Sequence, residues 1–293
     1  MNTPKKKKTS TKKFNIKNDP HVVVRGIIYS LTSVALIACI CISAYNIIRW
    51  KAENDISDQQ IVELQAETTI TEVDPEPTPE AKEKGPVIAN IPSTDPYWEL
   101  SKLPLIDVDL SSSLAKNQDV AGWIQVPGTN INYPFVHTDN NDYYLKHSLN
   151  RTWSSAGWVF LDASNNINLT DQNQIIYAHG RLDGSMFGSL TTVLTGDWQN
   201  DTKSHVVKIS TLKENSLWQV FSVYRIPVTS DYLTTSFESD SDFDNFLQMI
   251  SARSAYDFKT TAHSTDKIIT LSTCIGTTER AVLHAKLIKI AQK

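Results

Sequence analysis

The stretch KIITLSTC at Lys267–Cys274 and the stretch RAVLHAKLIKI at Arg280–Ile290 are two apolar, β-branched runs near the C-terminus. Runs of this composition, bounded by turn residues, are typical of β-strands. The short connection between them holds Gly276, and glycine can take the positive φ that a sharp turn needs. If the runs pair as a hairpin, Cys274 and Arg280 face each other across its mouth, with Cβ atoms roughly 5 Å apart.

Upstream of this hairpin, further short runs of β-branched and aromatic residues alternate with clusters of Asn, Asp, Gly and Ser. These runs are Gly157–Leu161, Asn173–His179, His205–Ser210 and Trp218–Ile226. Short, closely spaced strands of this kind predict a single antiparallel β-barrel or sandwich. The spacing of apolar residues in Asp242–Ser251 predicts a helix, and Leu114–Ala121 predicts another short one before the barrel.

The charges of the chain are unevenly distributed. The formal net charge is -4, yet residues 1–51 hold ten Lys/Arg and one acid, Asp19, which leaves 18 Lys/Arg against 31 Asp/Glu in the remainder. A basic head on an acidic body argues against nucleic acid as the partner of the body.

A long uncharged run, GIIYSLTSVALIACICISAYNII at Gly26–Ile48, follows the basic head. Its length suits one membrane-spanning helix. The heavier positive charge lies on its N-terminal side, so residues 1–25 are expected to be a cytoplasmic tail and the body to be exported. A cleaved signal peptide is the alternative, because Ile42–Ala44 offers small residues for cleavage, but the length of the run favours an uncleaved anchor.

Residues 49–94 are expected to be an extracytoplasmic spacer. They are acidic and contain Pro75, Pro77, Pro79, Pro86 and Pro92, and such a composition buries too little apolar surface to order itself. Only its start, Ile56–Ala66, is expected to be helical. The exported body then covers residues 95–293.

The chain holds three cysteines, of which Cys39 and Cys41 lie in the apolar run and Cys274 is the only thiol of the predicted body. Three cysteines spread in this way form neither a disulfide framework nor a zinc site. The acids of Asp139–Asp142 are too few for a calcium site, and we expect no metal and no cofactor. A lone exported thiol invites a functional explanation, with an inert buried side chain as the alternative.

A thiolate nucleophile usually needs a proton partner, and His179 is the best placed histidine. It ends the run QIIYAH, as Cys274 ends its own run, and Gly180 permits a sharp exit. His205 and His263 lie in polar surroundings typical of the surface, whereas His284 suits a filled barrel position.

Arg280 is the third candidate catalytic group. A guanidinium beside a thiol favours the thiolate, and it can donate hydrogen bonds to an oxyanion. The alternative is an ordinary pair between Arg280 and Glu279 or another surface acid.

Three stretches together resemble the class B sortases. TLSTC at Thr270–Cys274, followed by an arginine-bearing strand, resembles their active-site signature; IIYAHGRLDGSMFGSL at Ile175–Leu190 resembles their catalytic-histidine segment; and GWIQVPGTNINYPFVHTDNNDYYL at Gly122–Leu145 resembles their opening strands. The likeness covers about residues 97–290. Ala178 stands where the family has glycine and the loop from cysteine to arginine is compact, but neither departure removes a catalytic group.

The resemblance implies a closed antiparallel β-barrel of about eight strands with a few short helices, preceded by a single transmembrane helix. It implies a cysteine transpeptidase in which Cys274 attacks the carbonyl of a Thr-Gly or Thr-Asn bond in the sorting motif of a surface protein. His179 would protonate the departing amine, Arg280 would stabilise the oxyanion, and a thioester would pass the protein to an amine of a cell-wall precursor or a pilin.

Ser272, Thr273 and Tyr177 are candidate substrate contacts because they border the predicted nucleophile and histidine. Ordinary strand, core or rim positions are the alternative for all three. Two other functions stay open, namely a thiol hydrolase that cleaves without transfer and a non-catalytic, membrane-tethered binding module. Papain-type enzymes place cysteine before histidine, whereas His179 precedes Cys274 here, which counts against that fold.

Overall fold

The computed structural model describes residues 20–74 and 91–293, and the chain divides into two compact units, residues 1–52 and 53–293. The expected basic tail up to residue 19 and most of the prolines of the expected spacer lie outside the described residues. Helix α1 spans Pro20–Glu67. Its part His21–Ala52 is the one helix of the described chain that is long and apolar enough to cross a membrane.

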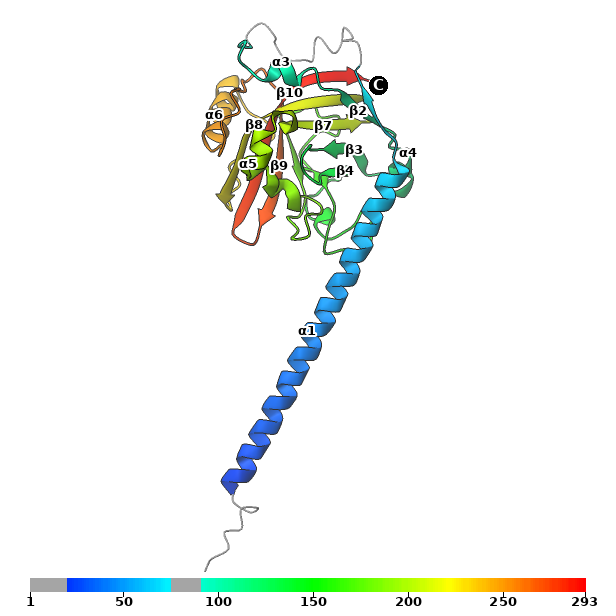
Figure 1. Cartoon of the computed structure of the whole chain (residues 1–293), viewed down its shortest axis with the longest axis vertical. Helices are drawn as coiled ribbons and strands as arrows, with labels where there is room; N and C mark the ends of the chain where they lie inside the picture. The colour runs from blue at the N-terminus through cyan, green and yellow to red at the C-terminus, as the bar shows by residue number, and fades with distance from the viewer. Residues whose placement is uncertain (1–19, 75–90) are drawn as a thin grey trace, which may run out of the picture. The chain divides into compact units, whose positions relative to one another are not determined.

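The second unit is built on a closed barrel with the strand order β10-β8-β7-β3-β4-β5-β6-β9. Figure 1 labels β3, β4, β7, β8, β9 and β10 of this barrel. Its strands are β3 (Val120–Gln125), β4 (Asn132–His137), β5 (Phe160–Leu161), β6 (Asn173–Tyr177), β7 (Val206–Thr211), β8 (Glu214–Pro227), β9 (Ile268–Ile275) and β10 (Glu279–Gln292). The prediction of a closed barrel of about eight strands is confirmed.

The barrel is mixed, which corrects the expectation of wholly antiparallel strands. β4 runs parallel to β5, and β6 runs parallel to β9, while the other neighbours are antiparallel. Parallel neighbours need long crossover connections, and residues 138–159 and 178–267 supply them. The parallel pairing of β6 with β9 is the most important for the site, because it brings the C-terminal ends of these two strands to the same edge of the barrel.

The side chains of β9 alternate between two environments, as a strand covered on both faces requires. Ile269 and Leu271 belong to the main core cluster, and Ile268 belongs to a second cluster with Phe243 of helix α6 (Asp240–Ala252). Cys274 follows Ile268 in the even-numbered set, so the alternation assigns it to the face that α6 and its flanking loops cover.

Helix α6 spans Asp240–Ala252 and confirms the helix predicted over Asp242–Ser251. Ser239 caps its N-terminus by accepting a hydrogen bond from the Asp242 N–H at 3.2 Å, which satisfies one of the otherwise unpaired amides of the first turn. The remaining short helices are α3 (Tyr97–Leu100), α4 (Ser111–Lys116), η3 (Tyr143–Leu145), η4 (Gly188–Leu194), α5 (Gly196–Asn200) and η5 (Thr202–Ser204).

The helix predicted over Leu114–Ala121 is only partly correct, because α4 ends at Lys116 and β3 begins at Val120. Asn117 breaks it: its side chain donates to the Tyr144 hydroxyl at 2.6 Å and accepts from the Asp119 N–H at 2.9 Å. Asparagine side chains often compete in this way with the helical hydrogen bonds of the backbone.

Part of the expected spacer lies in the second compact unit. Ile61 and Leu64, near the end of α1, are 8% and 2% exposed and belong to the main core cluster. Strand β1 (Ile70–Val73) then pairs antiparallel with β2 (Leu105–Val108). This region is acidic overall, but its few apolar residues are sufficient to pack it into the main core.

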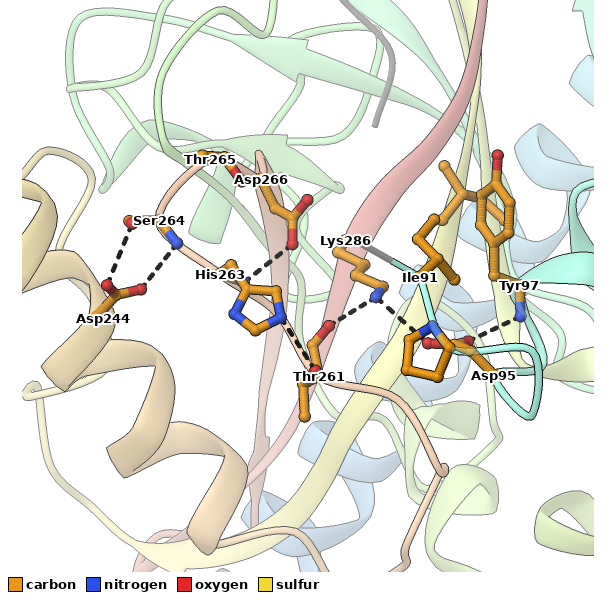
Figure 2. A pocket seen from close by; sticks show the side chains of 12 residues that line it. Ile91, Asp95, Tyr97, Asp244, Thr261, His263, Ser264, Thr265, Asp266 and Lys286 are labelled. Carbon is orange, nitrogen blue, oxygen red and sulfur yellow. Dashed lines mark hydrogen bonds and ion pairs between the residues drawn. The ribbon is translucent and has the colours of Figure 1, made fainter. Parts of the chain in front are cut away.

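A polar cavity of about 500 Å³ lies where the segment before β2 crosses β10 (Figure 2). Lys286 of β10 donates to the Thr261 carbonyl at 2.6 Å and lies 3.8 Å from the Asp95 carboxylate. Asp95 also accepts hydrogen bonds from the Tyr97 N–H at 2.8 Å and from Gln219 at 2.8 Å. These bonds fasten the start of the predicted body to the barrel.

Candidate active site

The β9–β10 hairpin forms as the sequence predicts. Cys274 and Arg280 are direct partners in its register, and the following pair is Ile275 with Glu279. Gly276 in the turn has a φ of 58°, a left-handed conformation that glycine adopts without steric penalty. Thiol and guanidinium therefore stand opposite each other at the mouth of the hairpin.

The parallel pairing of β6 with β9 brings His179 to the same place. Tyr177 is the register partner of Ser272, and the Thr273 hydroxyl donates to the Ala178 carbonyl at 2.8 Å. β6 itself ends at Tyr177, so His179 lies just beyond the strand rather than on its last position. The next residue is in contact with the nucleophile segment, since a Cβ built on Gly180 would lie 1.9 Å from the Cys274 carbonyl oxygen.

The orientation of the His179 ring is fixed by a backbone carbonyl. Its Nε2 lies 2.8 Å from the Leu145 carbonyl oxygen. A carbonyl oxygen only accepts hydrogen bonds, so Nε2 carries the proton and Nδ1 is the nitrogen left for proton transfer. Gly157, with a φ of 59°, makes room for the ring, because a Cβ there would lie 3.0 Å from the His179 Cδ2.

Arg280 does not pair with the carboxylate of Glu279. Its Nη1 donates to the Glu279 backbone carbonyl at 3.0 Å, whereas the Glu279 carboxylate pairs with Arg225. Among the described residues, no carboxylate forms an ion pair with Arg280, and the guanidinium keeps most of its donors for other partners.

Cys274, His179 and Arg280 all line one cleft of about 700 Å³. Its lining includes Tyr177 and Ala178 at the end of β6, and it also includes Val228, Thr229, Ser230, Tyr232 and Leu233, which follow β8. The cleft is thus built where several segments that are far apart in the sequence meet.

Ser272, Thr273 and Tyr177 also line this cleft, but their hydroxyl groups have partners within the protein. Ser272 Oγ lies 2.9 Å from the Tyr232 hydroxyl, and Tyr177 donates to the Asp162 carboxylate at 2.9 Å. Burial and the neighbouring Asp162 raise the pKa of Tyr177, so its hydroxyl stays protonated.

Tyr232 is a cleft residue that no sequence pattern singled out. It is 1% exposed, its hydroxyl reaches Ser272, and Arg280 and Cys274 are close enough to influence its ionisation. Burial raises its pKa. It lies in a connection without regular structure, where no periodicity marks a residue as buried.

Two other histidines occupy buried positions. His284 lies between the Tyr224 hydroxyl and Thr270 Oγ1, both at 2.9 Å, and burial lowers its pKa to about 3. It therefore fills an interior position as an uncharged ring. His205, expected at the surface, is 4% exposed and packs against Trp198 and Phe258, so that expectation is wrong. Trp198 and Phe258 are not adjacent to His205 in the sequence. An expectation based on the polar residues next to His205 therefore misses this packing.

In the parts of the chain that the structure describes, no group of three or more His, Cys, Asp or Glu side chains is arranged to hold a metal ion. A thiol, an imidazole and a guanidinium that line one cleft are typical of thiol-dependent acyl-transfer and hydrolytic enzymes.

Comparisons with known proteins identify the family within that class. A sortase-domain family model matches residues 124–288. Sortase B of Listeria monocytogenes is 34% identical over 178 residues, covering 59% of this chain and 71% of the relative. Sortase B of Staphylococcus aureus is 32% identical over 179 residues, covering 60% and 72%.

Solved structures agree with the sequence comparisons. Sortase B from Bacillus anthracis in complex with AAEK1 matches with a TM-score of 0.57 and 37% identity, over 61% of this chain and 84% of that chain. A sortase B complexed with triglycine matches with a TM-score of 0.58 and 32% identity, over 61% and 85%. The chain therefore belongs to the sortase family, as a class B sortase. It is a sortase-type cysteine transpeptidase.

Proposed function

We propose that Cys274, His179 and Arg280 perform the transpeptidation. The Cys274 thiolate attacks the carbonyl carbon of a threonine that precedes glycine or asparagine in the sorting motif of a surface protein. Arg280 donates hydrogen bonds to the oxyanion that forms. The imidazolium of His179 gives its proton to the departing amine as the C–N bond breaks, which leaves a thioester on Cys274 and a neutral ring.

The second half of the proposed cycle reverses these roles. The amine of an acceptor attacks the thioester carbonyl, and His179 takes a proton from that amine. The C–S bond breaks, the Cys274 thiolate is restored, and a new amide bond joins the surface protein to the acceptor. The thioester conserves the energy of the original peptide bond, so the transfer needs no nucleotide.

The observation that carries this proposal is the convergence of Cys274, His179 and Arg280 on one cleft. Cys274 and Arg280 are register partners, and the backbone beside His179 contacts the Cys274 carbonyl. The ring orientation adds support, because the Leu145 carbonyl occupies Nε2 and leaves Nδ1 for the proton.

We assign Ser272, Thr273 and Tyr177 to the substrate cleft as residues that shape it. Their hydroxyls are bonded within the protein, so the contacts they offer to a sorting peptide are backbone groups and the tyrosine ring. The amine of a cell-wall precursor or of a pilin is the proposed acceptor, and the sortase B structure complexed with triglycine supports a glycine-type amine.

The proposed location is the outer face of the cell membrane, with residues 26–48 as a single uncleaved anchor and residues 1–25 in the cytoplasm. The apolar part of α1 and the excess of Lys/Arg before it support this orientation. Residues 95–293 remain the proposed catalytic domain, with the docked residues 53–73 as an addition to it.

Transfer and hydrolysis can be separated with the full-length chain in detergent micelles. A peptide library containing Thr-Gly and Thr-Asn bonds is supplied with and without triglycine, and products are identified by mass spectrometry. Transpeptidation predicts a ligated product that depends on triglycine, whereas cleavage without ligation would support the hydrolase instead.

Variants at the two reacting groups test the residue assignments. Cys274→Ala is expected to abolish turnover, and His179→Ala is expected to lower kcat/KM by at least about 10²-fold, in line with general acid–base catalysis. Circular dichroism confirms that each variant is folded. A near-normal rate in His179→Ala would refute its assignment.

A further inference from the structure

His179 begins a closed loop that ends at Phe187. The Phe187 N–H donates to the His179 carbonyl at 3.0 Å, and Gly180 forms an isolated antiparallel bridge with Met186. Strand β6 holds the backbone before His179, and this closure holds the backbone after it. The position of the imidazole therefore depends on the conformation of the loop.

The loop lies directly on the backbone that bears the nucleophile. A Cβ on Gly180 would lie 1.9 Å from the Cys274 carbonyl oxygen, and a Cβ on Gly188 would lie 2.1 Å from the Arg181 carbonyl oxygen. Both contacts are too close for any side chain. A change in the loop would consequently alter the distance between His179 and Cys274.

A polar cluster inside the loop fixes its conformation. Arg181 Nη2 donates to Asp183 at 2.6 Å, and Arg181 Nε donates to Ser185 Oγ at 2.7 Å. Asp183 also accepts from the Ser185 N–H at 3.0 Å and hydroxyl at 2.7 Å. The Arg181 side chain is only 9% exposed, so the loop is folded around it.

Apolar packing does not hold the tip of this loop. Leu182 is fully exposed, while the buried apolar residues Met186 and Phe187 lie only at its end. Outside the loop, Asn130 donates to the Gly184 carbonyl at 3.3 Å. The cluster of Arg181, Asp183 and Ser185 is thus the main source of order between Gly180 and Met186.

The ionisation of Asp183 supports this role of the cluster. Burial raises the pKa of Asp183, but hydrogen bonds from Arg181 and Ser185 outweigh it and bring the value to about 2. The carboxylate therefore stays ionised, and the pair stays intact, at every pH at which the protein is expected to work. Asp58, near the end of α1, adds a second acid beside the pair.

We propose that Arg181 and Asp183 are positioning residues that hold His179 against the Leu145 carbonyl and beside Cys274. This inference rests on the proposed role of His179 and adds residues that touch neither substrate nor thiol. Misplacement of a catalytic group by about 1 Å can lower a rate by roughly 10²-fold, so such a pair affects catalysis without contacting the reacting atoms.

Arg181→Ala in the full-length chain tests the proposal, with a peptide and triglycine selected in the library assay. We expect kcat to fall roughly 10- to 100-fold with KM changed less than about twofold, because the cleft keeps its lining while the imidazole loses its place. Arg181→Lys is expected to recover only part of kcat, since an ammonium cannot serve Asp183 and Ser185 with a planar fork.

Asp183→Asn keeps an acceptor for Ser185 but removes the ion pair, and its kcat is expected to lie between those of wild type and Arg181→Ala. Lys259→Ala is the matched control: Lys259 pairs with Asp257, also two residues away, and both are largely exposed on another loop. It is expected to leave kcat and KM unchanged.

A second measurement is independent of the substrate. With ¹³C-labelled histidine, the His179 ring signal is assigned by its loss in His179→Gln. Arg181→Ala is expected to broaden and move this signal, because the ring is no longer held in one position, whereas Lys259→Ala is expected to leave it unchanged.

The outcomes separate the two hypotheses. If His179→Ala is inactive but Arg181→Ala keeps kcat within twofold and an unchanged His179 ring signal, the positioning role is overturned and the catalytic assignment stands. A raised KM with normal kcat in Arg181→Ala also overturns it, by indicating a substrate contact. Should Arg181→Ala not fold, Arg181→Lys and Asp183→Asn decide by the same criteria.

Discussion

Strand β10 carries a positively charged side chain at each of two polar sites, Lys286 and Arg280. The two side chains differ in their hydrogen-bond and ion-pair partners. At the Lys286 site, the ammonium donates to the Thr261 carbonyl, and its neighbour Asp95 accepts from backbone and side-chain donors (Figure 2). At the Arg280 site, the guanidinium donates to the Glu279 carbonyl and has no carboxylate partner in the described chain.

The difference is the one expected between a structural contact and the proposed catalytic site. Groups that are satisfied by one another resist change, and removing one partner of a buried pair is strongly destabilising. Donors that the fold leaves unused beside a thiol are available to a charge that develops during a reaction. The two sites should therefore respond oppositely to mutation, with activity lost at one and stability lost at the other.

Replacement of Arg280 is expected to give the largest effect. Arg280→Ala should lower kcat/KM by roughly 10²–10³-fold, the usual result of removing one oxyanion donor, with little change in thermal stability. Rates in the transfer assay and Tm by calorimetry check both parts. A variant that loses stability and keeps its rate would place Arg280 with Lys286 as a structural residue.

Replacement of Lys286 is expected to show the reverse pattern. Lys286→Met leaves the nearly buried Asp95 carboxylate without its cation and should lower the free energy of unfolding by about 3 kcal/mol. The rate per folded molecule should stay normal.

The double variant Lys286→Met/Asp95→Asn isolates the ion pair in a double-mutant cycle. It should recover part of the lost stability, because the uncompensated charge is gone. Urea unfolding of wild type, Lys286→Met, Asp95→Asn and the double variant gives the coupling energy, and strict additivity would show that Lys286 and Asp95 do not interact.

Local sequence patterns predicted much of the Arg280 site. Two β-branched runs with a short turn are enough to set Cys274 opposite Arg280, and the end of a third run places His179. What those patterns could not show is that β6 pairs parallel with β9, which depends on contacts between distant segments. The roles of these residues stay predictions.

The Lys286 site escaped prediction for the same reason. Asp95, Gln219 and Lys286 are far apart along the chain, and none of them stands in a motif. Their pairing appears only once β8 and β10 are adjacent and the segment before β2 crosses them. Likewise, the acidic composition of the region around Ile61 and Leu64 predicted a spacer, but these two apolar residues are buried in the core.

A smaller effect is expected from pH at the Lys286 site. Burial raises the pKa of Asp266, which lines this cavity, above the ordinary 3.8. Between the ordinary and the raised value, the folded state binds more protons than the unfolded state, so stability falls as pH rises through that window. Asp266→Asn should flatten this part of the Tm–pH curve. An unchanged curve would mean that Asp266 is not the titrating group.

The smallest effect is expected at Glu279, the residue that could have neutralised Arg280. Its carboxylate pairs with Arg225 at the surface, where the two side chains are 31% and 55% exposed. Exposed pairs of this kind contribute about 0–1 kcal/mol, so Glu279→Gln should change Tm little. The Arg280 bond uses the Glu279 backbone carbonyl, which this substitution keeps, so kcat should also stay close to that of wild type. A clear rise in kcat would instead show that this carboxylate competes with the substrate for Arg280, and the contrast between the two sites of β10 would be weaker than the structure indicates.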